Sequence, residues 1–175
     1  ANNNLITNCG TSSMSLLLGG QYQLYHNTFA NYGFDFNRED PGFFSTDFFP
    51  DSTGTDIELN TFNGDLQNNI FWGNLDDEFG FNFQGAGNSI LMDYNFVKIN
   101  DPDLQSFLGG ANNILRPTTD DLQFKDFREY NFELDTLSPA KDQGNAQISN
   151  LIGPDLNNNT RSDGLPDMGA YEKEN

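Results

Sequence analysis

The sequence predicts an all-β fold, a right-handed parallel β-helix (solenoid) of about four to six coils with one long inserted loop and an irregular C-terminal cap. A short pattern occurs at residues 24–29, 66–71 and 92–97, and each copy has an apolar residue three positions before an asparagine and another two positions after it. The copies recur at intervals that fit coils of about 20 residues or slightly more. Asn, Gly and Phe are abundant whereas Ala, Lys and Glu are scarce, which disfavours helices and suits short strands joined by tight turns.

The asparagine of each copy sets the register of the predicted coils. Asn4, in a degenerate further copy, lies 23 positions before Asn27, and Asn27 lies 42 positions before Asn69, which lies 26 before Asn95. The middle interval is therefore one coil plus about 20 residues. We expect Asn27, Asn69 and Asn95 to form a ladder at a bend of the coils, in the left-handed conformation that asparagine tolerates, with each amide bonded to the next. We interpret this ladder as scaffold.

Inward side chains one coil apart should stack in columns, because alternate residues of a strand point to the same face. One column is predicted to hold Leu24, Leu66 and Met92, a second Ile6, Phe29, Phe71 and Val97, and another wall Leu16, Leu59 and Phe81. Leu16 and Phe81 each lie 12 positions after a ladder asparagine, whereas Leu59 lies 32 positions after Asn27. This offset predicts an insertion at residues 34–53.

The predicted insertion is rich in phenylalanine, and so many rings cannot all remain in water. Three interpretations stay open: a flap folded on the coil wall, a glycan-binding rim with aromatic platforms, or a contact between subunits of an oligomer. Trp72 follows the Phe71 column and should point outward or lie at a corner, as a further sugar platform or as cover for the insertion. The carbohydrate-binding candidates are Arg38, Phe43, Phe44, Phe48, Phe49 and Trp72.

The coil period is lost after residue 100, so we expect a single domain with coils in residues 1–100 and terminal irregular coils and a cap in residues 101–175. The chain opens within the repeat, and we expect it to be part of a longer protein. Met168 and Tyr171 are predicted to plug the open end of the core.

Three stretches of the later chain share a signature: Ser-Pro-Ala-Lys-Asp-Gln-Gly-Asn at 138–145, Asp-Leu-Asn-Asn-Asn-Thr-Arg at 155–161 and Asp-Met-Gly-Ala-Tyr-Glu at 167–172. They resemble the C-terminal signature of secreted bacterial β-helix proteins of the choice-of-anchor Q type, which has Gly where Asn158 stands here. The resemblance implies a secreted or surface-attached protein of polysaccharide-rich settings, often from Bacteroidetes. It implies no single activity, because the anchor and the catalytic region vary within that family.

The stretch 155–161 also places oxygen-bearing side chains at alternating positions, as the start of an EF-hand loop does. The candidate Ca²⁺ ligands are Asp155, Asn157, Asn159 and Asp163. The pattern lacks the glycine of loop position 6 and the glutamate of position 12, since Thr160 and Pro166 stand there. A capping turn and a Ca²⁺ site therefore both stay open.

The net charge of −18 and the pI near 4.1 argue against binding to nucleic acid or to anionic membrane surfaces, since both need clusters of Lys and Arg. No apolar run approaches the roughly 18 residues that span a bilayer. Cys9 is the single cysteine, which leaves no internal disulfide.

Catalytic groups are hard to find. The candidates are the acidic turn of Asp76, Asp77 and Glu78 with Asp93 one coil on, because hydrolases use paired carboxylates; a solvated acidic turn is the alternative. His26 is expected at an exposed corner.

The sequence therefore predicts a non-catalytic C-terminal module of a secreted or cell-surface bacterial protein that faces polysaccharide, in binding or adhesion. The alternatives are a polysaccharide lyase or glycoside hydrolase acting on acidic glycans, with its catalytic residues on the β-helix wall or on missing N-terminal coils, and a purely structural or adhesive stalk.

Overall fold

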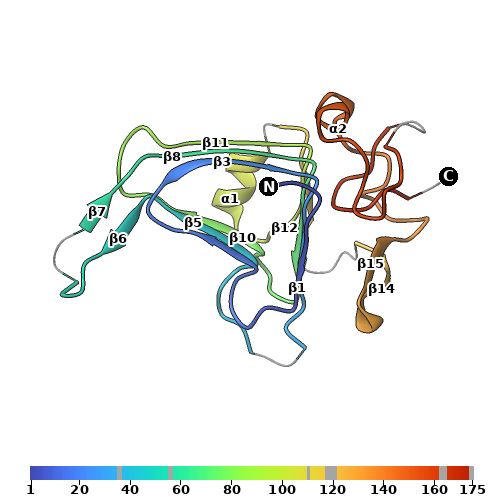
Figure 1. The fold of residues 1–175 in the computed structure, drawn as a ribbon. Coiled ribbons are helices and arrows are strands. Elements are labelled where there is room, and N and C mark those ends of the chain that lie inside the picture. The colour runs from blue at the N-terminus through green and yellow to red at the C-terminus, as the bar shows by residue number, and fades with distance from the viewer. Residues whose placement is uncertain (35–36, 55–56, 110, 117–121, 162–164, 174–175) are drawn as a thin grey trace.

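Parallel sheets make up most of the fold in the computed structural model, which describes residues 1–34, 37–54, 57–109, 111–116, 122–161 and 165–173 (Figure 1). The largest sheet has the order β1 (Leu5–Thr7), β4 (Thr28–Asn31), β9 (Ile70–Gly73), β12 (Phe96–Lys98), β13 (Ile114–Arg116). A second sheet has the order β10 (Phe79–Asn82), β5 (Phe43–Thr46), β2 (Met14–Leu16), and a third β11 (Ser89–Asp93), β8 (Phe62–Gln67), β3 (Gly20–Tyr25).

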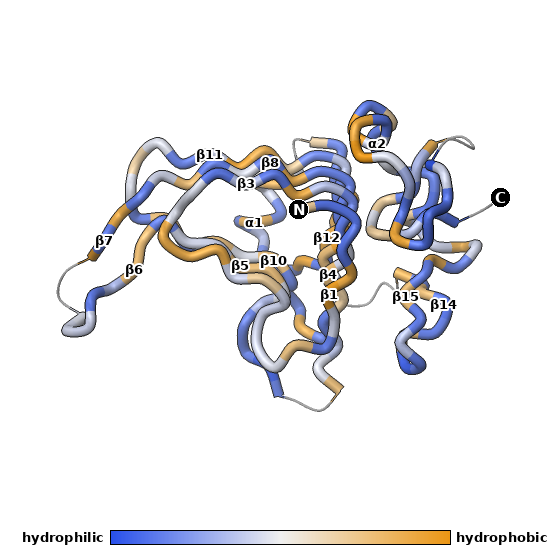
Figure 2. The backbone as a smooth tube through the Cα atoms, in the orientation of Figure 1, coloured by the Kyte–Doolittle hydropathy of each residue, from blue (hydrophilic) through white to orange (hydrophobic). Residues whose placement is uncertain are grey.

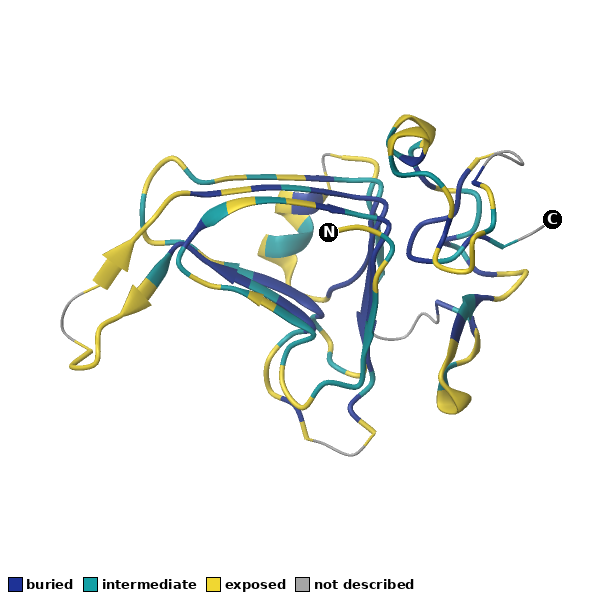
Figure 3. Cartoon of the chain, in the orientation of Figure 1, coloured by how far each residue is buried: buried dark blue, intermediate teal, exposed yellow. Residues whose placement is uncertain are grey.

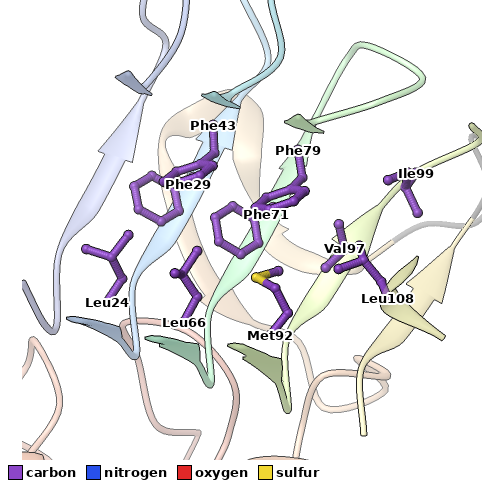
Figure 4. Close-up of a cluster of buried hydrophobic side chains, with 10 residues drawn as sticks. All are labelled: Leu24, Phe29, Phe43, Leu66, Phe71, Phe79, Met92, Val97, Ile99 and Leu108. Carbon is purple, nitrogen blue, oxygen red and sulfur yellow. The ribbon is translucent and has the colours of Figure 1, made fainter. Parts of the chain in front are cut away.

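The chain visits these three sheets in rotation, so that each circuit adds one parallel strand to each sheet. The circuits are β2–β3–β4, then β5–β8–β9, then β10–β11–β12. Leu24 pairs in register with Leu66, and Leu66 with Met92. Phe29 and Val97 both pair with Phe71. The two predicted apolar columns are thereby confirmed, and Figure 4 shows them side by side in the interior.

The interior is close-packed and largely aromatic. Phe29 and Phe71 stack with ring centroids 5.1 Å apart, and Phe43 and Phe79 stack at 5.3 Å. All four rings are fully buried. Stacked aromatic pairs add about 0.5–1.5 kcal/mol each beyond the burial of apolar area. Figure 2 shows the matching alternation of apolar and polar residues along β3, β8 and β11, which leaves one side of each strand for solvent.

The predicted asparagine ladder is present at the bend that precedes β4, β9 and β12. The side-chain amide of Asn27 donates to Asn69 Oδ1 at 2.9 Å, and that of Asn69 donates to Asn95 Oδ1 at 3.0 Å. The ladder extends at its two ends through Asn4 and Asn113. The expected left-handed conformation of the ladder residues is wrong: the residue before each of them has the positive φ instead, namely Asn3, His26, Asn68 and Tyr94.

The position predicted for the insertion is also corrected. Residues 34–53 contain β5, which pairs with β2 and β10, so that Ser45 lies level with Leu16 and Phe81. Leu59 is therefore outside that wall. The extra residues form a long connection before β5 and an antiparallel hairpin after it, β6 (Phe48–Pro50) with β7 (Ile57–Leu59). Figures 1 and 3 show this hairpin projecting from the body with exposed strands.

The later chain covers the coils in two different ways. Helix α1 (Pro102–Leu108) begins at the N-cap Asp101 and buries Leu108 in the interior cluster beside Met92 and Val97. The remaining elements are β14 (Phe124–Asp126), the 3₁₀ helix η1 (Phe127–Glu129), β15 (Asn131–Leu134) and α2 (Ala146–Ile152). No helix among the described residues has the length and apolar character needed to span a membrane.

The described residues 122–161 and 165–173 lie on the outer side of the five-stranded sheet (Figure 1). Met168 packs there in one cluster with Ile70, Phe96 and Phe132, and the backbone N–H of Gly169 donates to the carbonyl of Asn68 at 2.7 Å. Met168 therefore seals the side of the sheet, and the prediction that it plugs the end of the core is wrong. Tyr171 belongs to the same lateral cluster.

Candidate functional site

The outward side of the β3–β8–β11 sheet carries an ordered array of polar side chains. Because inward positions hold the apolar columns, the intervening residues point outward, and all of those in the columns below except the buried Gln67 keep contact with solvent. The strand register aligns them in three outward columns: Gln21, Asn63 and Ser89; Gln23, Asp65 and Leu91; Tyr25, Gln67 and Asp93. These columns place amides, carboxylates and hydroxyls at the spacing of neighbouring strands, roughly 4.8 Å.

Asp65 is the centre of this face. Its Oδ2 accepts a hydrogen bond from the Tyr25 hydroxyl at 2.5 Å, and its Oδ1 accepts one from the side-chain amide of Gln67 at 2.8 Å. Partial burial, together with the neighbouring Asp65 carboxylate, raises the pKa of Tyr25 to about 12. The phenol therefore stays protonated at neutral pH and holds the carboxylate in a fixed orientation.

A groove of about 700 Å³ runs over this face. The outward residues that line it are Gln21, Gln23, Asn63, Asp65, Ser89 and Leu91. Leu91 is 51% exposed and gives the groove an apolar patch among the amides. Such a surface can form many hydrogen bonds with a ligand that also presents small apolar faces.

Trp72 does not present its ring to solvent. It points outward from β9 as expected, but the C-terminal segment covers it and leaves it 3% exposed. Its ring contacts Phe96, with centroids 5.3 Å apart, and Lys98 Nζ lies 5.5 Å from its centroid. The expectations of a sugar platform or of cover for the insertion at Trp72 are both wrong, because its outer face is occupied by this chain's own residues.

Arg38 and Glu78, predicted for a glycan-binding rim and for catalysis, form one buried ion pair with Nη2 and Oε1 2.6 Å apart. The other Glu78 oxygen accepts from the backbone N–H of Gly42 at 2.8 Å, and Arg38 also donates to Asn74. Both side chains are shielded from solvent. They connect the turn before β10 to the loop before β5, so neither is placed to meet a polysaccharide.

The phenylalanines of the predicted insertion divide between core and surface. Phe43 is fully buried in the interior, which contradicts its assignment as a sugar platform. Phe44 and Phe48 are half-buried. Phe49 is 52% exposed on the outer side of the hairpin. The structure therefore does not bring these four rings together on one rim.

The remaining catalytic candidates are also separated. Asp76 and Asp77 line a cleft of about 560 Å³ between their turn and α1. Asp77 Oδ1 accepts from the backbone N–H groups of Asn100 and Asp101, so it acts as a turn cap. Asp93 ends β11 and accepts from the backbone N–H of Asn112 at 2.9 Å. Strands β9 and β12 separate Asp93 from the acidic turn.

The proposed Ca²⁺ ligands are engaged in hydrogen bonds within the C-terminal segment. Asp155 Oδ1 accepts from the backbone N–H of Asn159 at 2.7 Å, and Oδ2 accepts from that of Glu172 at 2.7 Å. Asn157 points to Glu133, with Nδ2 3.0 Å from Oε1. Asp163 lies outside the described residues. Asp155 thus closes a turn, as the capping-turn interpretation of this stretch expects.

His26 was expected at an exposed corner and is fully buried instead. Its Nε2 lies 2.7 Å from Ser149 Oγ on α2 and 2.9 Å from the side-chain nitrogen of Asn68. Burial and, in the same direction, the positive charge of Arg161 lower the pKa of His26 to about 3. The imidazole is therefore neutral at pH 7 and serves to dock α2 on the coil corner.

The residues of the groove were not among the sequence candidates. Their signal was present in the alternation of β3, β8 and β11, which marks Gln23, Asp65 and Leu91 as outward once the inward column is known. Comparison with family models, with curated proteins and with solved structures gave no match.

Proposed function

We propose that the chain is a right-handed parallel β-helix module of a secreted or cell-surface bacterial protein, and that it binds neutral polysaccharide along its β3–β8–β11 face. The sequential parallel strands, the stacked core columns and the asparagine ladder support the solenoid. The C-terminal signature at 138–145, 155–161 and 167–172, which resembles the choice-of-anchor Q type, supports the location.

The observation that carries the binding proposal is the groove of about 700 Å³ over two of the aligned outward columns, Gln21, Asn63 and Ser89 and Gln23, Asp65 and Leu91. Polysaccharides present hydroxyl groups in a repeat and small apolar faces of their rings between them. The side-chain amides of Gln21, Gln23 and Asn63 can each donate and accept, and the exposed Leu91 offers apolar contact. A chain ligand can follow the groove across successive strands.

The charge of the face selects the class of glycan. Asp65 lies in the groove, and the whole chain carries a net charge of −18. A uronate polymer would be repelled by these like charges, and the repulsion is stronger at low salt, where charges are screened less. A neutral glycan avoids this repulsion, so its binding should change little between low and high ionic strength.

The test is a glycan array followed by titration calorimetry of wild type, Gln23→Ala and Asp65→Ala, with Glu58→Ala on the hairpin as matched surface control. We expect wild type and Glu58→Ala to bind the same neutral polysaccharides. Gln23→Ala and Asp65→Ala should bind about tenfold more weakly, the effect of roughly 1.4 kcal/mol, and Gln23→Ala should do so with unchanged melting temperature. Wild type that binds only uronate polymers or no glycan, or groove variants with unaltered affinity, would contradict the proposal.

A further inference from the structure

Two segments far apart in sequence bring four aromatic rings together beside the five-stranded sheet. Tyr32, just after β4, stacks on Phe127 of η1 with centroids 4.3 Å apart and planes inclined by 14°. Phe34 lies 5.7 Å from Tyr32 and 6.1 Å from Phe127, nearly parallel to both. Tyr130 stands against Phe34 at 6.1 Å with its plane turned by 89°. We call these four residues the aromatic corner.

The outer rings of the aromatic corner are open to solvent. Phe34 is 43% exposed and Tyr130 is 58% exposed. Tyr130 also has a φ of 60°, a left-handed conformation that residues with a side chain adopt infrequently. The inner rings, Tyr32 and Phe127, fix the positions of the outer ones by stacking. The corner therefore leaves parts of two perpendicular aromatic rings in solvent, beside a stacked pair that holds Phe34.

The size of the exposed surface argues for a small ring as its occupant. The exposed parts of Phe34 and Tyr130 amount to roughly 200 Å², given the 150–250 Å² of a whole aromatic side chain. A stable protein partner needs about 800 Å² on each side, so this patch alone does not hold one. The area suits the apolar face of one pyranose ring, and the exposed Arg128, whose Cζ lies 5.6 Å from the Phe127 ring centroid, offers hydrogen-bond donors next to it.

We propose that Phe34 and Tyr130 form a second carbohydrate subsite, which takes one pyranose ring of a neutral glycan by stacking. It rests on the glycan binding proposed above but uses a different surface. The groove lies on the outward side of β3, β8 and β11, whereas the corner lies beside β14 and β15 (Figure 1). None of the corner residues belongs to the groove lining.

Titration calorimetry with cellohexaose and laminarihexaose tests the subsite in wild type, Phe34→Ser and Tyr130→Asn. Asn is suited to the left-handed position, so the second variant removes the ring without straining the backbone. Phe49→Ser is the matched control, because Phe49 is similarly exposed on the hairpin. We expect both corner variants to bind about fivefold to tenfold more weakly, the loss of one stacking contact, and Phe49→Ser to bind as wild type does.

Asp65→Ala in the same titration separates this inference from the proposed function. Corner variants that bind as wild type, while Asp65→Ala loses affinity, overturn the subsite alone. If the corner variants lose affinity and Asp65→Ala keeps it, the subsite is supported and the groove is overturned. Equal losses of affinity in Phe49→Ser and in the corner variants overturn the subsite. Wild type that binds neither oligosaccharide also overturns it and removes the support for glycan binding.

Discussion

Replacing Asn69 by alanine removes the central rung of the asparagine ladder. Asn69 is fully buried, and its Oδ1 accepts from both the backbone N–H of Asn27 at 3.0 Å and the Asn27 side-chain amide at 2.9 Å. Its own amide donates to the carbonyl of Leu24 at 2.8 Å. Asn95 Oδ1 keeps one donor, the backbone N–H of residue 69, at 2.9 Å. The substitution therefore takes one hydrogen bond each from three groups, the two Asn27 donors and the Leu24 carbonyl, although the Asn27 side-chain amide keeps a second bond to the Ala1 carbonyl at 3.2 Å.

The cost follows from the desolvation of those three groups. A buried polar group without a partner costs about 1–3 kcal/mol, and partial relaxation lowers the sum, so we expect a loss of roughly 3–6 kcal/mol in the free energy of unfolding. Single domains have about 5–15 kcal/mol in total. Asn69→Ala should therefore lose a large part of the stability, although the apolar columns on either side remain intact.

Urea unfolding monitored by circular dichroism measures this loss. Asn4→Ala is the matched control, since Asn4 lies at the exposed end of the same ladder and its side-chain amide donates to Asn27 Oδ1 and to the carbonyl of Asn2, both at 2.8 Å. Asn4→Ala should cost about 1 kcal/mol or less. A loss below about 1.5 kcal/mol in Asn69→Ala, with an unchanged denaturant slope, would refute the reasoning. The buried groups would then have found other partners or water.

Two further predictions concern buried charge. The pKa of His26 is about 3 in the folded chain against 6.5 for the free side chain. The stability that neutral His26 contributes is therefore present above pH 6.5, and up to about 4–5 kcal/mol is lost as pH falls toward 3. Burial raises the pKa of Asp167 to about 6, so this carboxyl changes stability in the opposite direction. His26→Gln should show a shallower acid loss of urea midpoint between pH 6.5 and 4, and equal pH profiles would contradict the assignment. Glu78→Gln should lower the free energy of unfolding by about 3–5 kcal/mol, because it leaves Arg38 buried without its carboxylate. Glu133→Gln, in an exposed pair, should lower it by under about 1 kcal/mol. Similar urea midpoints in the two variants would disprove the role of the buried pair.

Much of the coil register could be predicted because the repeat is a direct consequence of parallel stacking. Leu24, Leu66 and Met92 must each fill the same space one strand apart, and the ladder asparagine must satisfy the same bend. Those requirements leave a periodic trace in the sequence. Asn113 escaped notice because it follows Asn95 after only 18 positions, across α1.

The predicted location of the insertion was wrong for a related reason. Counting backward from Leu59 assumes one insertion, whereas the chain has a long connection before β5 and a hairpin after it. Two insertions on either side of a strand preserve the total offset and hide the strand between them. Phe43 is the inward residue of that strand, and its interior position became clear only from its contact with Phe79.

The burial of Trp72 and His26 could not be read from periodicity, because both lie on outward or corner positions of the coils. Their cover comes from residues 122–173, more than 40 positions away in sequence, through contacts such as His26 with Ser149. Alternation distinguishes inward from outward, but it does not distinguish an outward face in water from one beneath another segment. That distinction depends on long-range packing.

The difference between a covered and an uncovered outward face also separates the walls of the coils. The outer face of the five-stranded sheet is covered by the C-terminal segment, which buries Trp72 and Phe96. The β3–β8–β11 face keeps the two outward columns of the groove open, and Gln23 and Leu91 stay exposed there. Because these side chains make no contribution to the interior columns, they can change without loss of packing. A stable stack with one uncovered wall therefore separates the residues that hold the fold from those that can meet a ligand.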